Sequence, residues 1–324
     1  MAARYQIGFL MDPYPSLNLD TETSLLLMDE LIRRGHAVYW LEQTDITLGN
    51  RGVTARLPSV RSTAPFELDD AASIDINALN ALVIRKDPPF DRTYLHVTQI
   101  LDHLDERLVQ INSPAALRNL NEKLTTLRWP EFCPQTLVSC DPAQLLTFAT
   151  QFQRVVIKPL GECSGRGIAI MRHSDPDFVP RIAAMQAAHG FLMAQEYLDN
   201  VAFGDKRVFV VAGEPIGWVN RLPADAMSLA NIHQGATCAA TSLSALEQRI
   251  SLAVGRTLLH EGILLAGLDF IDGRLTEINV TSPSAVRQIN AVTGGRLELT
   301  IVDAILSHIA AASSRDPAGH KRTA

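Results

Sequence analysis

Hydrophobic and polar positions in the first third of the chain predict repeated strand and helix units. Four short apolar runs are typical of buried strands, at residues 5–11, 36–41, 79–84 and 108–111. Between them, residues 23–34 and 94–104 carry apolar side chains at helical spacing. Residues 44–70 are polar and poor in aromatics, which predicts a small hairpin excursion or loops. Repeated βα units indicate an open, mostly parallel sheet that binds ligands at the carboxyl ends of its strands.

Polar loops follow two of these predicted strands and mark the ligand-binding edge of the sheet. Asp12-Pro13 ends the first strand, and Arg85-Lys86-Asp87 ends the third. Adjacent Arg85 and Lys86 could clamp a substrate carboxylate, with Asp12 on the neighbouring loop. The alternative is a solvated loop that ends at a proline. The pattern alone does not decide between a substrate clamp and such a loop.

The pattern changes after residue 121. Helices are predicted at residues 121–129, 142–151, 244–259, 284–293 and 297–312, and strands at 136–139, 191–197, 208–211 and 216–221. Residues 222–243 are polar and lack apolar periodicity, which predicts a mobile loop that closes over a bound ligand. The charged tail at residues 313–324 is predicted to be disordered.

Two further strands, within residues 155–171, enclose a loop with three glycines in seven residues. Gly165 and Gly167 would let backbone N–H groups approach phosphate oxygens closely, and Lys158 on the first strand adds a point charge. The loop is not a Walker loop, because no Gly-Lys-Ser/Thr follows, and not a Rossmann fingerprint, because it leads into a strand. By itself such a hairpin is a weak indication of nucleotide binding.

The clearest local signal is the hairpin around Asp272-Gly273, a dipeptide that favours tight turns. On its second strand, Glu277 and Asn279 are two residues apart and share a face, whereas the apolar residues beside them point to the core. Asp269 on the first strand can reach the same polar face. Two carboxylates and an amide oxygen suit Mg²⁺ that also binds nucleotide phosphates. The alternative is a plain hairpin with one solvated face.

Composition narrows the class of protein. The 324 residues are 47% hydrophobic and 20% charged, which is ordinary for a globular protein of two or three subdomains. The net charge of −6, with scattered basic residues, argues against a nucleic-acid partner. The four cysteines form no metal-binding spacing, which suggests a reducing compartment. No apolar run is long enough to cross a bilayer, so we expect a cytoplasmic protein.

Five motifs together resemble the ATP-grasp fold and, more narrowly, the bacterial glutathione synthetases. They are Met11-Asp-Pro13, Arg85-Lys-Asp-Pro-Pro-Phe-Asp91, Asn121-Glu-Lys123, Gly204-Asp-Lys-Arg207 and Leu275-Thr-Glu-Ile-Asn-Val-Thr-Ser-Pro283. The resemblance runs from about residue 5 to residue 308. It implies an α/β chain in which an N-terminal open parallel-sheet domain, residues 1–120, precedes an ATP-grasp domain, residues 121–312. The latter would comprise a lid subdomain at about 121–200 and a catalytic part at about 201–312.

The resemblance implies an ATP-dependent carboxylate–amine ligase. ATP would phosphorylate the carboxylate of γ-glutamylcysteine, and the amine of glycine would attack the resulting acyl phosphate. The implied cofactors are ATP and Mg²⁺, with Mn²⁺ as a substitute. The expected partners are small-molecule substrates and further copies of the chain in a dimer or tetramer, with no nucleic acid and no membrane.

The resemblance also assigns roles to individual residues. The metal ligands would be Asp269, Glu277 and Asn279. Nucleotide contacts would come from Lys123, Lys158, Ser164, Gly165, Gly167, Lys206 and the hinge residues Glu196, Tyr197 and Leu198. Substrate contacts would come from Asp12, Arg85, Lys86, Arg221, Ser282 and Arg287. Arg207, Arg221 and Lys206 would be catalytic, since they would stabilise charge on the transferred phosphoryl group.

Two departures from the family pattern leave other functions open. The glycine loop has fewer glycines than the family carries, and Ala236-Thr-Cys-Ala239 stands where the family has an arginine in a Gly-Gly-Arg-Gly-Glu run. A glutathione synthetase in which Arg166 or Arg221 supplies the missing charge fits these changes. So does a divergent ligase for another acid and amine, or a catalytically silent ligand-binding relative. The retained lysines and metal-ligand candidates argue against the silent relative.

Overall fold

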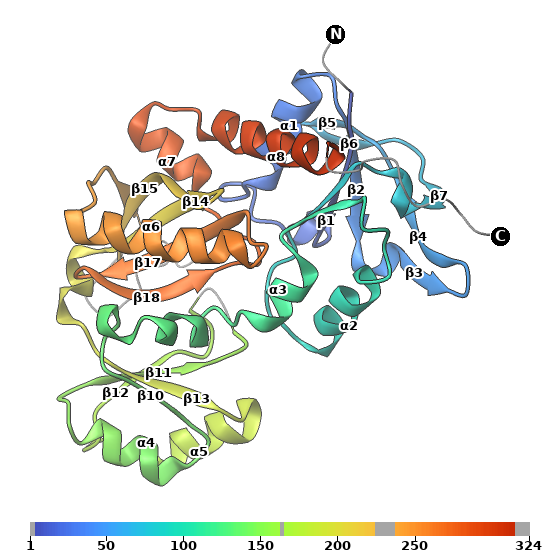
Figure 1. Ribbon diagram of the computed structural model, residues 1–324. Coiled ribbons are helices and arrows are strands. Elements are labelled where there is room, and N and C mark those ends of the chain that lie inside the picture. Colours follow the sequence, from blue (N-terminus) through green and yellow to red (C-terminus); the bar gives the residue numbers. More distant parts are fainter. Residues whose placement is uncertain (1–3, 163–164, 224–236, 315–324) are drawn as a thin grey trace.

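The computed structural model describes residues 4–162, 165–223 and 237–314 (Figure 1). Four parallel strands form the N-terminal sheet in the order β2-β1-β8-β9. Their bounds are β1 Gln6–Met11, β2 Ala37–Glu42, β8 Ala81–Ile84 and β9 Val109–Ile111. The open parallel sheet predicted from the βα pattern is therefore confirmed.

Helices cover both faces of this sheet because alternate strand side chains point to opposite sides. Ile7 and Phe9 pack in one apolar cluster with α1 (Ser24–Arg33) and α8 (Leu297–Ser313). Leu10, on the other face, packs in a second cluster with α2 (Arg92–Leu101) and α3 (Pro114–Asn119). In Figure 1, the C-terminal helix α8 lies beside α1, so the two ends of the chain share one layer.

Residues 46–75 leave the sheet as antiparallel hairpins, in agreement with the hairpin alternative for the polar stretch. The strands are β3 Ile46–Gly49, β4 Gly52–Leu57, β5 Val60–Thr63, β6 Phe66–Leu68 and β7 Ala72–Asp75. They pair as β3-β4-β7 and β5-β6.

Within the segment predicted as a lid, residues 136–196 form a separate small unit with its own core, at the bottom of Figure 1; we refer to this unit as the lid. Its antiparallel sheet has the order β10-β13-β11-β12, and helices α4 (Pro142–Ala149) and α5 (Phe178–His189) pack on it. The strands are β10 Thr136–Ser139, β11 Val155–Pro159, β12 Ala169–Met171 and β13 Leu192–Glu196. A unit with its own core can shift as a body relative to the rest of the molecule.

The central sheet is antiparallel, with the order β16-β15-β14-β17-β18. Its strands are β14 Asp205–Val211, β15 Glu214–Leu222, β16 Thr237–Ala239, β17 Leu265–Ile271 and β18 Arg274–Asn279. Helix α6 (Ala245–His260) lies against one face, and α7 (Val286–Thr293) and α8 lie against the other. A parallel sheet followed by two larger antiparallel sheets agrees with the predicted ATP-grasp class.

The central sheet and the N-terminal domain share apolar clusters and a buried polar joint. Asn112 is 2% exposed; its Nδ2 donates to the carbonyls of Leu265 and Val280 at 2.8 and 2.7 Å. Its Oδ1 accepts from the backbone of Leu264 and Leu265 at 2.8 and 2.9 Å. With its donors and its acceptor all satisfied, this amide fixes the N-terminal domain on the central sheet.

Two predicted elements differ from the structure. Residues 121–129 do not form an α-helix: Asn121 Oδ1 accepts from the backbone of Lys123 and Leu124, and a short 3₁₀ turn, Leu124–Arg128, follows. Local side-chain bonds of this kind compete with helical ones. The predicted mobile loop at 222–243 is partly ordered, since Thr237–Ala239 pairs with β15. Residues 224–236 of that loop, and 315–324 of the predicted tail, lie outside the described residues.

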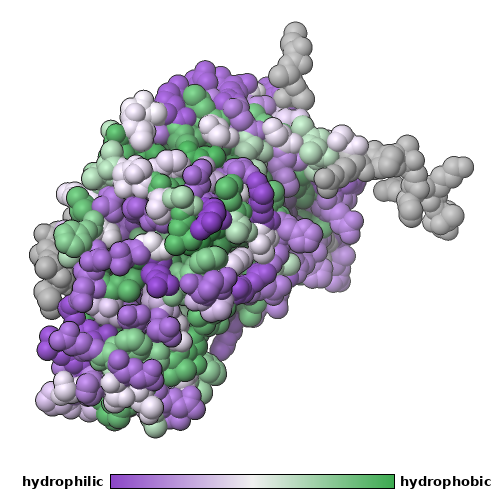
Figure 2. All heavy atoms as spheres, turned by 60° about the vertical axis from the view of Figure 1, so that its left-hand side comes forward, coloured by the Kyte–Doolittle hydropathy of each residue, from purple (hydrophilic) through white to green (hydrophobic). Residues whose placement is uncertain are grey.

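The described part of the chain contains no helix that is both long and apolar enough to cross a membrane. The face seen in Figure 2 mixes hydrophilic and hydrophobic residues.

Candidate active site

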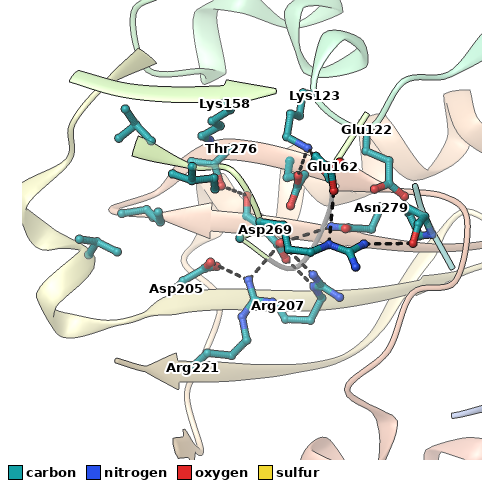
Figure 3. Close-up of a pocket in the computed structure, with 18 of the residues that line it drawn as sticks. Glu122, Lys123, Lys158, Glu162, Asp205, Arg207, Arg221, Asp269, Thr276 and Asn279 are labelled. Atoms are coloured by element: carbon teal, nitrogen blue, oxygen red, sulfur yellow. Dashed lines mark hydrogen bonds and ion pairs between the residues drawn. The ribbon is translucent and has the colours of Figure 1, made fainter. Parts of the chain in front are cut away.

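A pocket lies where the lid sheet, the central sheet and loops of the N-terminal domain meet (Figure 3). Residues far apart in the sequence contribute to its walls. The predicted site residues that line it are Lys123, Lys158, Gly165, Glu196, Tyr197, Leu198, Arg207, Arg221, Asp269, Glu277, Asn279 and Ser282. The structure thus brings together candidates from the lid, the hinge and both strands of the β17–β18 hairpin.

The β17–β18 hairpin has the turn that its sequence predicts. Asp272 and Gly273 both have positive φ, 51° and 71°, as a tight two-residue hairpin turn requires. The turn pairs Ile271 with Arg274, and a register shift between Asp269 and Phe270 then brings Asp269 opposite Glu277. Asn279 Nδ2 lies 3.2 Å from Asp269 Oδ2, so the three candidate metal ligands share one face.

Two arginines hold Asp269 from the neighbouring strands. Arg207 on β14 binds both carboxylate oxygens, with Nη2 2.9 Å from Oδ2. Arg221 on β15 places Nη2 3.0 Å from Asp269 Oδ2 and 2.6 Å from Asp205 Oδ2. The four side chains are almost fully buried, at 4 to 14% exposure. This is a closed, desolvated charge network, in which each charge depends on its partners.

Burial and pairing shift the ionisation of these groups in opposite directions. Burial alone would raise the pKa of Asp269, but Arg207 and Arg221 hold it well below its usual range. For Asp205, burial outweighs Arg221, and its pKa is raised. Burial opposes the charged form of Arg221, yet the two carboxylates raise its pKa, so it stays a cation.

Two lysines reach the pocket from the lid side. Lys123 Nζ lies 3.2 Å from Glu277 Oε1 and donates to the Glu162 carbonyl of the glycine loop. Lys158 Nζ donates to Gln195 Oε1 at 2.8 Å, and burial lowers its pKa. Both ammonium groups are desolvated cations that a polyphosphate would stabilise.

The hinge between lid and central sheet forms the apolar end of the pocket. Here Tyr197 and Leu198 follow β13, and the apolar lining residues are Val156, Ile168, Ile170, Val201 and Ile271. Glu196 lines the same end, beside the hinge backbone. A flat aromatic base would find apolar walls at this end and the lysines beyond it.

The glycine loop connects β11 to β12 over the pocket. Gly165 and Gly167 have φ of 77° and 68°, a conformation that glycine adopts without strain. A side chain at Gly167 would also meet Pro159 Cγ at 2.9 Å. Gly165 lines the pocket, whereas Ser164 lies outside the described residues.

The structure places four predicted substrate-binding side chains outside the pocket lining, where they brace its N-terminal wall. Lys86 Nζ binds Asp12 Oδ1 at 2.6 Å. Arg85 is 2% exposed and donates to Ser24 Oγ and to the Pro283 carbonyl. Arg287 Nε donates to the carbonyl of Glu22 at 2.8 Å. Asp87, which follows Arg85 and Lys86 in the sequence, does line the pocket.

Lys206 also lies away from the pocket, in contrast to its predicted catalytic role. Asp205 and Arg207 line the pocket, so the residue between them points to the other face of β14. There Lys206 Nζ binds both oxygens of Glu247 at 3.0 and 2.9 Å, at the N-terminus of α6. This lysine connects the sheet to a helix.

Several pocket residues were missed from the sequence. They are Glu22, Asp87, Glu122, Glu162, Gln195, Asp205 and Thr276. A signal existed for Asp205, because it is two residues from Arg207 and therefore shares its face. Glu122 accepts from Thr281 Oγ1 at 2.8 Å, a contact between segments 159 residues apart, and no local pattern encodes it.

Acidic side chains outnumber basic ones in the pocket lining. The described lining carries eight carboxylate side chains and five cationic ones. Asp205 Oδ1 is buried and has no hydrogen-bond partner within the described part of the chain. Asp269, Glu277 and Asn279 offer hard oxygen donors on one face. These residues fit a hard divalent cation, which would also offset the charge of a polyphosphate.

A lid with a glycine loop, a central sheet with acidic strand positions and a connection between them are the features of the ATP-grasp fold. Solved structures share this fold. D-cycloserine synthetase DcsG has a TM-score of 0.67 at 15% identity, covering 94% of this chain and 99% of its own. The ATP-grasp ligase PsnB, complexed with minimal precursor, has a TM-score of 0.64 at 19% identity, with the same coverage.

Sequence comparisons identify the family. The prokaryotic glutathione synthetase N-terminal domain matches residues 5–118, and the ATP-grasp domain of the same family matches residues 122–294. The chain belongs to the prokaryotic glutathione synthetase family, as the motifs predicted.

Individual relatives support the same family assignment. A glutathione synthetase of Vibrio parahaemolyticus is 34% identical over 308 residues, which cover 93% of this chain and 97% of the relative. One from Coxiella burnetii is 36% identical over 293 residues, which cover 88% and 91%. The chain is an ATP-dependent ligase that forms C–N bonds.

Proposed function

We propose that this chain joins γ-glutamylcysteine to glycine with ATP and so makes glutathione. The observation that supports this most directly is the convergence of the hairpin acids, two lysines and two buried arginines on one pocket. Family membership supports the choice of substrates. The use of Mg²⁺ or Mn²⁺, a cytoplasmic location and assembly into a dimer or tetramer stay predictions.

In this proposal ATP lies along the pocket with its base at the hinge. Lys123 and Lys158 bind the phosphates, and Asp269, Glu277 and Asn279 hold a divalent cation that would neutralise charge on them. The donor dipeptide occupies the opposite end, near Glu22 and Asp87. The donor therefore presents its carboxylate to the γ-phosphate from the N-terminal side.

The reaction then needs two transfers. A carboxylate oxygen of the donor attacks the γ-phosphorus, the bond to the β-phosphate oxygen breaks, and ADP leaves. The glycine nitrogen attacks the acyl carbon, the bond to the phosphate oxygen breaks, and the nitrogen loses a proton. Arg207 and Arg221, fixed by Asp269, present positive charge where the phosphoryl group passes. No protein nucleophile is required.

The test is a substrate panel with the purified protein, in which released phosphate and ligated product are both quantified. We expect ATP-dependent tripeptide from γ-glutamylcysteine and glycine, with the highest kcat/KM of the panel. Ligation of a different acid or amine with no tripeptide would contradict the proposal and favour a divergent ligase. One observation favours that second function: residues 222–248 contain neither lysine nor arginine.

A further inference from the structure

Glu122 closes the outer edge of the strand that carries two of the candidate metal ligands. Within the described part of the chain, β18 is an edge strand of the central sheet, so its outward N–H groups need partners from outside the sheet. The carbonyl of Glu122 accepts from the N–H of Ile278 at 2.9 Å, and its side-chain Oε1 accepts from the N–H of Val280 at 3.2 Å. Residue 122 therefore takes the place of a neighbouring strand at the two positions on either side of Asn279.

The same carboxylate also holds the chain just beyond the end of the strand. Oε1 of Glu122 accepts from the N–H of Thr281 at 3.3 Å and from Thr281 Oγ1 at 2.8 Å. Glu122 is 9% exposed, and Val280 and Thr281 are 0 and 5% exposed. Because these donors are buried, loss of their shared acceptor would leave them unsatisfied. The carboxylate of Glu122 therefore fixes the backbone at residues 280 and 281.

The segment that Glu122 holds joins two parts of the pocket. Asn279, a candidate metal ligand, lies at one end of the segment, and Ser282 lies at the other. Ser282 hydrogen-bonds the carboxylate of Asp87 on the wall near which the donor is proposed to bind, and both residues line the pocket. Figure 3 shows Glu122 at the same end of the pocket as Asn279. The backbone at residues 280 and 281 therefore sets the distance between the metal-ligand face and the donor wall.

The neighbours of Glu122 connect it to the phosphate end of the pocket. Lys123, the next residue, places Nζ 3.2 Å from Glu277 Oε1. Asn121, the preceding residue, donates from Nδ2 to the carbonyl of Leu160 at 2.9 Å, directly after β11 of the lid. Glu122 is thus anchored beside a candidate phosphate-binding lysine, and the segment that it holds is fixed to the same frame as the nucleotide.

We infer that Glu122 is a positioning residue that aligns the carboxylate of the donor with the γ-phosphate. The inference rests on the proposed function and requires no contact between Glu122 and either substrate. A donor oxygen forms a bond to the γ-phosphorus as the bond to the β-phosphate oxygen breaks, and this in-line transfer depends on the separation of donor and nucleotide. Glu122 keeps that separation through its hydrogen bonds to the backbone between Asn279 and Ser282.

The experiment compares Glu122→Met, Glu122→Gln and a matched control, Glu247→Met, in the full chain. Glu122→Met removes the acceptor at nearly constant length, whereas Glu122→Gln keeps an oxygen that can accept from the same donors. Glu247 is also a buried acid that accepts from a backbone N–H, that of Ser244 at 2.7 Å, but it lies on α6 outside the pocket lining. The measurements are kcat and the separate KM values for the donor and for ATP.

We expect Glu122→Met to raise KM for the donor about tenfold and to lower kcat, with KM for ATP close to that of the parent. Glu122→Gln should restore most of the donor KM, because the acceptor is retained. Glu247→Met should lower the melting temperature and leave both KM values unchanged. A purely structural role of Glu122 would give the same result as Glu247→Met and would overturn the inference.

Thr281→Val tests the same contact with a smaller change, should Glu122→Met fail to fold. It removes only the hydroxyl donor at nearly constant shape, and we expect KM for the donor to rise about twofold to fivefold. KM for ATP should not change. An unchanged donor KM in Thr281→Val and Glu122→Met, or equal rises in both KM values, would overturn the inference.

Failure of the proposed function gives a different result. A parent that ligates another acid would contradict the proposed function, and KM for that acid would then test Glu122. Amide hydrogen exchange needs no substrate at all: the amides of Val280 and Thr281 should exchange faster in Glu122→Met than in the parent, and Glu122→Gln should match the parent. Equal exchange in the three proteins would overturn the inference.

Discussion

The floor and the roof of the pocket carry their charges in different ways. The floor consists of β14, β15, β17 and β18, where Arg207, Arg221 and Asp269 are buried and bound to one another. The roof is the glycine loop of the lid, where Arg166 is largely exposed and bound to a neighbouring acid and a carbonyl. The charges on the floor are therefore held by one another in a buried network, whereas the charge on the roof is held by contacts at the exposed surface of the pocket. Under the proposed function, the paired charges of the floor would support phosphoryl transfer.

The largest expected effect is on folding, from a break in the floor network. Arg221→Met leaves Asp205 and Asp269 buried with one partner fewer, and we expect it to lower the free energy of unfolding by about 3–5 kcal/mol. Arg181→Ala in the lid removes an exposed pair and should cost at most about 1 kcal/mol. Urea unfolding of both variants checks this. Equal losses would mean that the buried network contributes no more than a surface pair.

The next largest expected effect is on the rate of phosphoryl transfer. Glu277→Gln removes a charge from the metal-ligand face at nearly constant shape, and we expect phosphoryl transfer to fall about 100-fold to 1000-fold. Glu214→Gln is the matched control, because Glu214 lies on β15 of the same sheet and is exposed beside Arg256. Phosphate release at saturating Mg²⁺ is the measurement. Near-normal turnover in Glu277→Gln would remove Glu277 from the metal site.

A smaller effect separates two of the three lysines that the resemblance assigned to the nucleotide. Lys158→Ala should weaken ATP binding about tenfold to 100-fold, because it removes a charge-assisted contact with phosphate. Lys206→Ala should leave ATP affinity unchanged and should instead loosen the N-terminus of α6, where Glu247 loses its partner. Calorimetric titration with ATP, together with thermal unfolding, distinguishes the two. Similar affinities in both variants would assign Lys158 a structural role.

The smallest expected effect is a pH dependence of donor binding. Desolvation, and then the nearby charge of Glu22, raise the pKa of Asp87 to about 6. If its carboxylate binds the ammonium group of the donor, binding is intact above pH 6 and is lost as the pH falls through that value. We expect KM for the donor to rise severalfold between about pH 7 and pH 5, with KM for ATP as the internal control. Asp87→Asn should have a high KM that no longer changes over this range.

Local sequence determined much of this protein. Alternation of strands and helices predicted the N-terminal parallel sheet, and Asp272-Gly273 predicted the hairpin turn. The two-residue spacing along the second strand predicted the shared face of Glu277 and Asn279. These features follow from backbone preferences and from the two-residue period of a strand, which act over a few residues. The same period, applied to Arg207, would have predicted Asp205 in the pocket and Lys206 on the opposite face.

Only the tertiary structure decided which charges pair. Arg207 and Arg221 both bind Asp269 because β17, which is distant in the sequence, pairs with the β14–β15 hairpin in the central sheet. Arg85 and Lys86 brace a loop while their neighbour Asp87 reaches the pocket, and Arg166 meets Pro88 across 78 residues of sequence. A motif specifies which charged groups are available, but their partners depend on strand order and domain packing. Those long-range contacts are set by the burial of whole elements and cannot be read from any one segment.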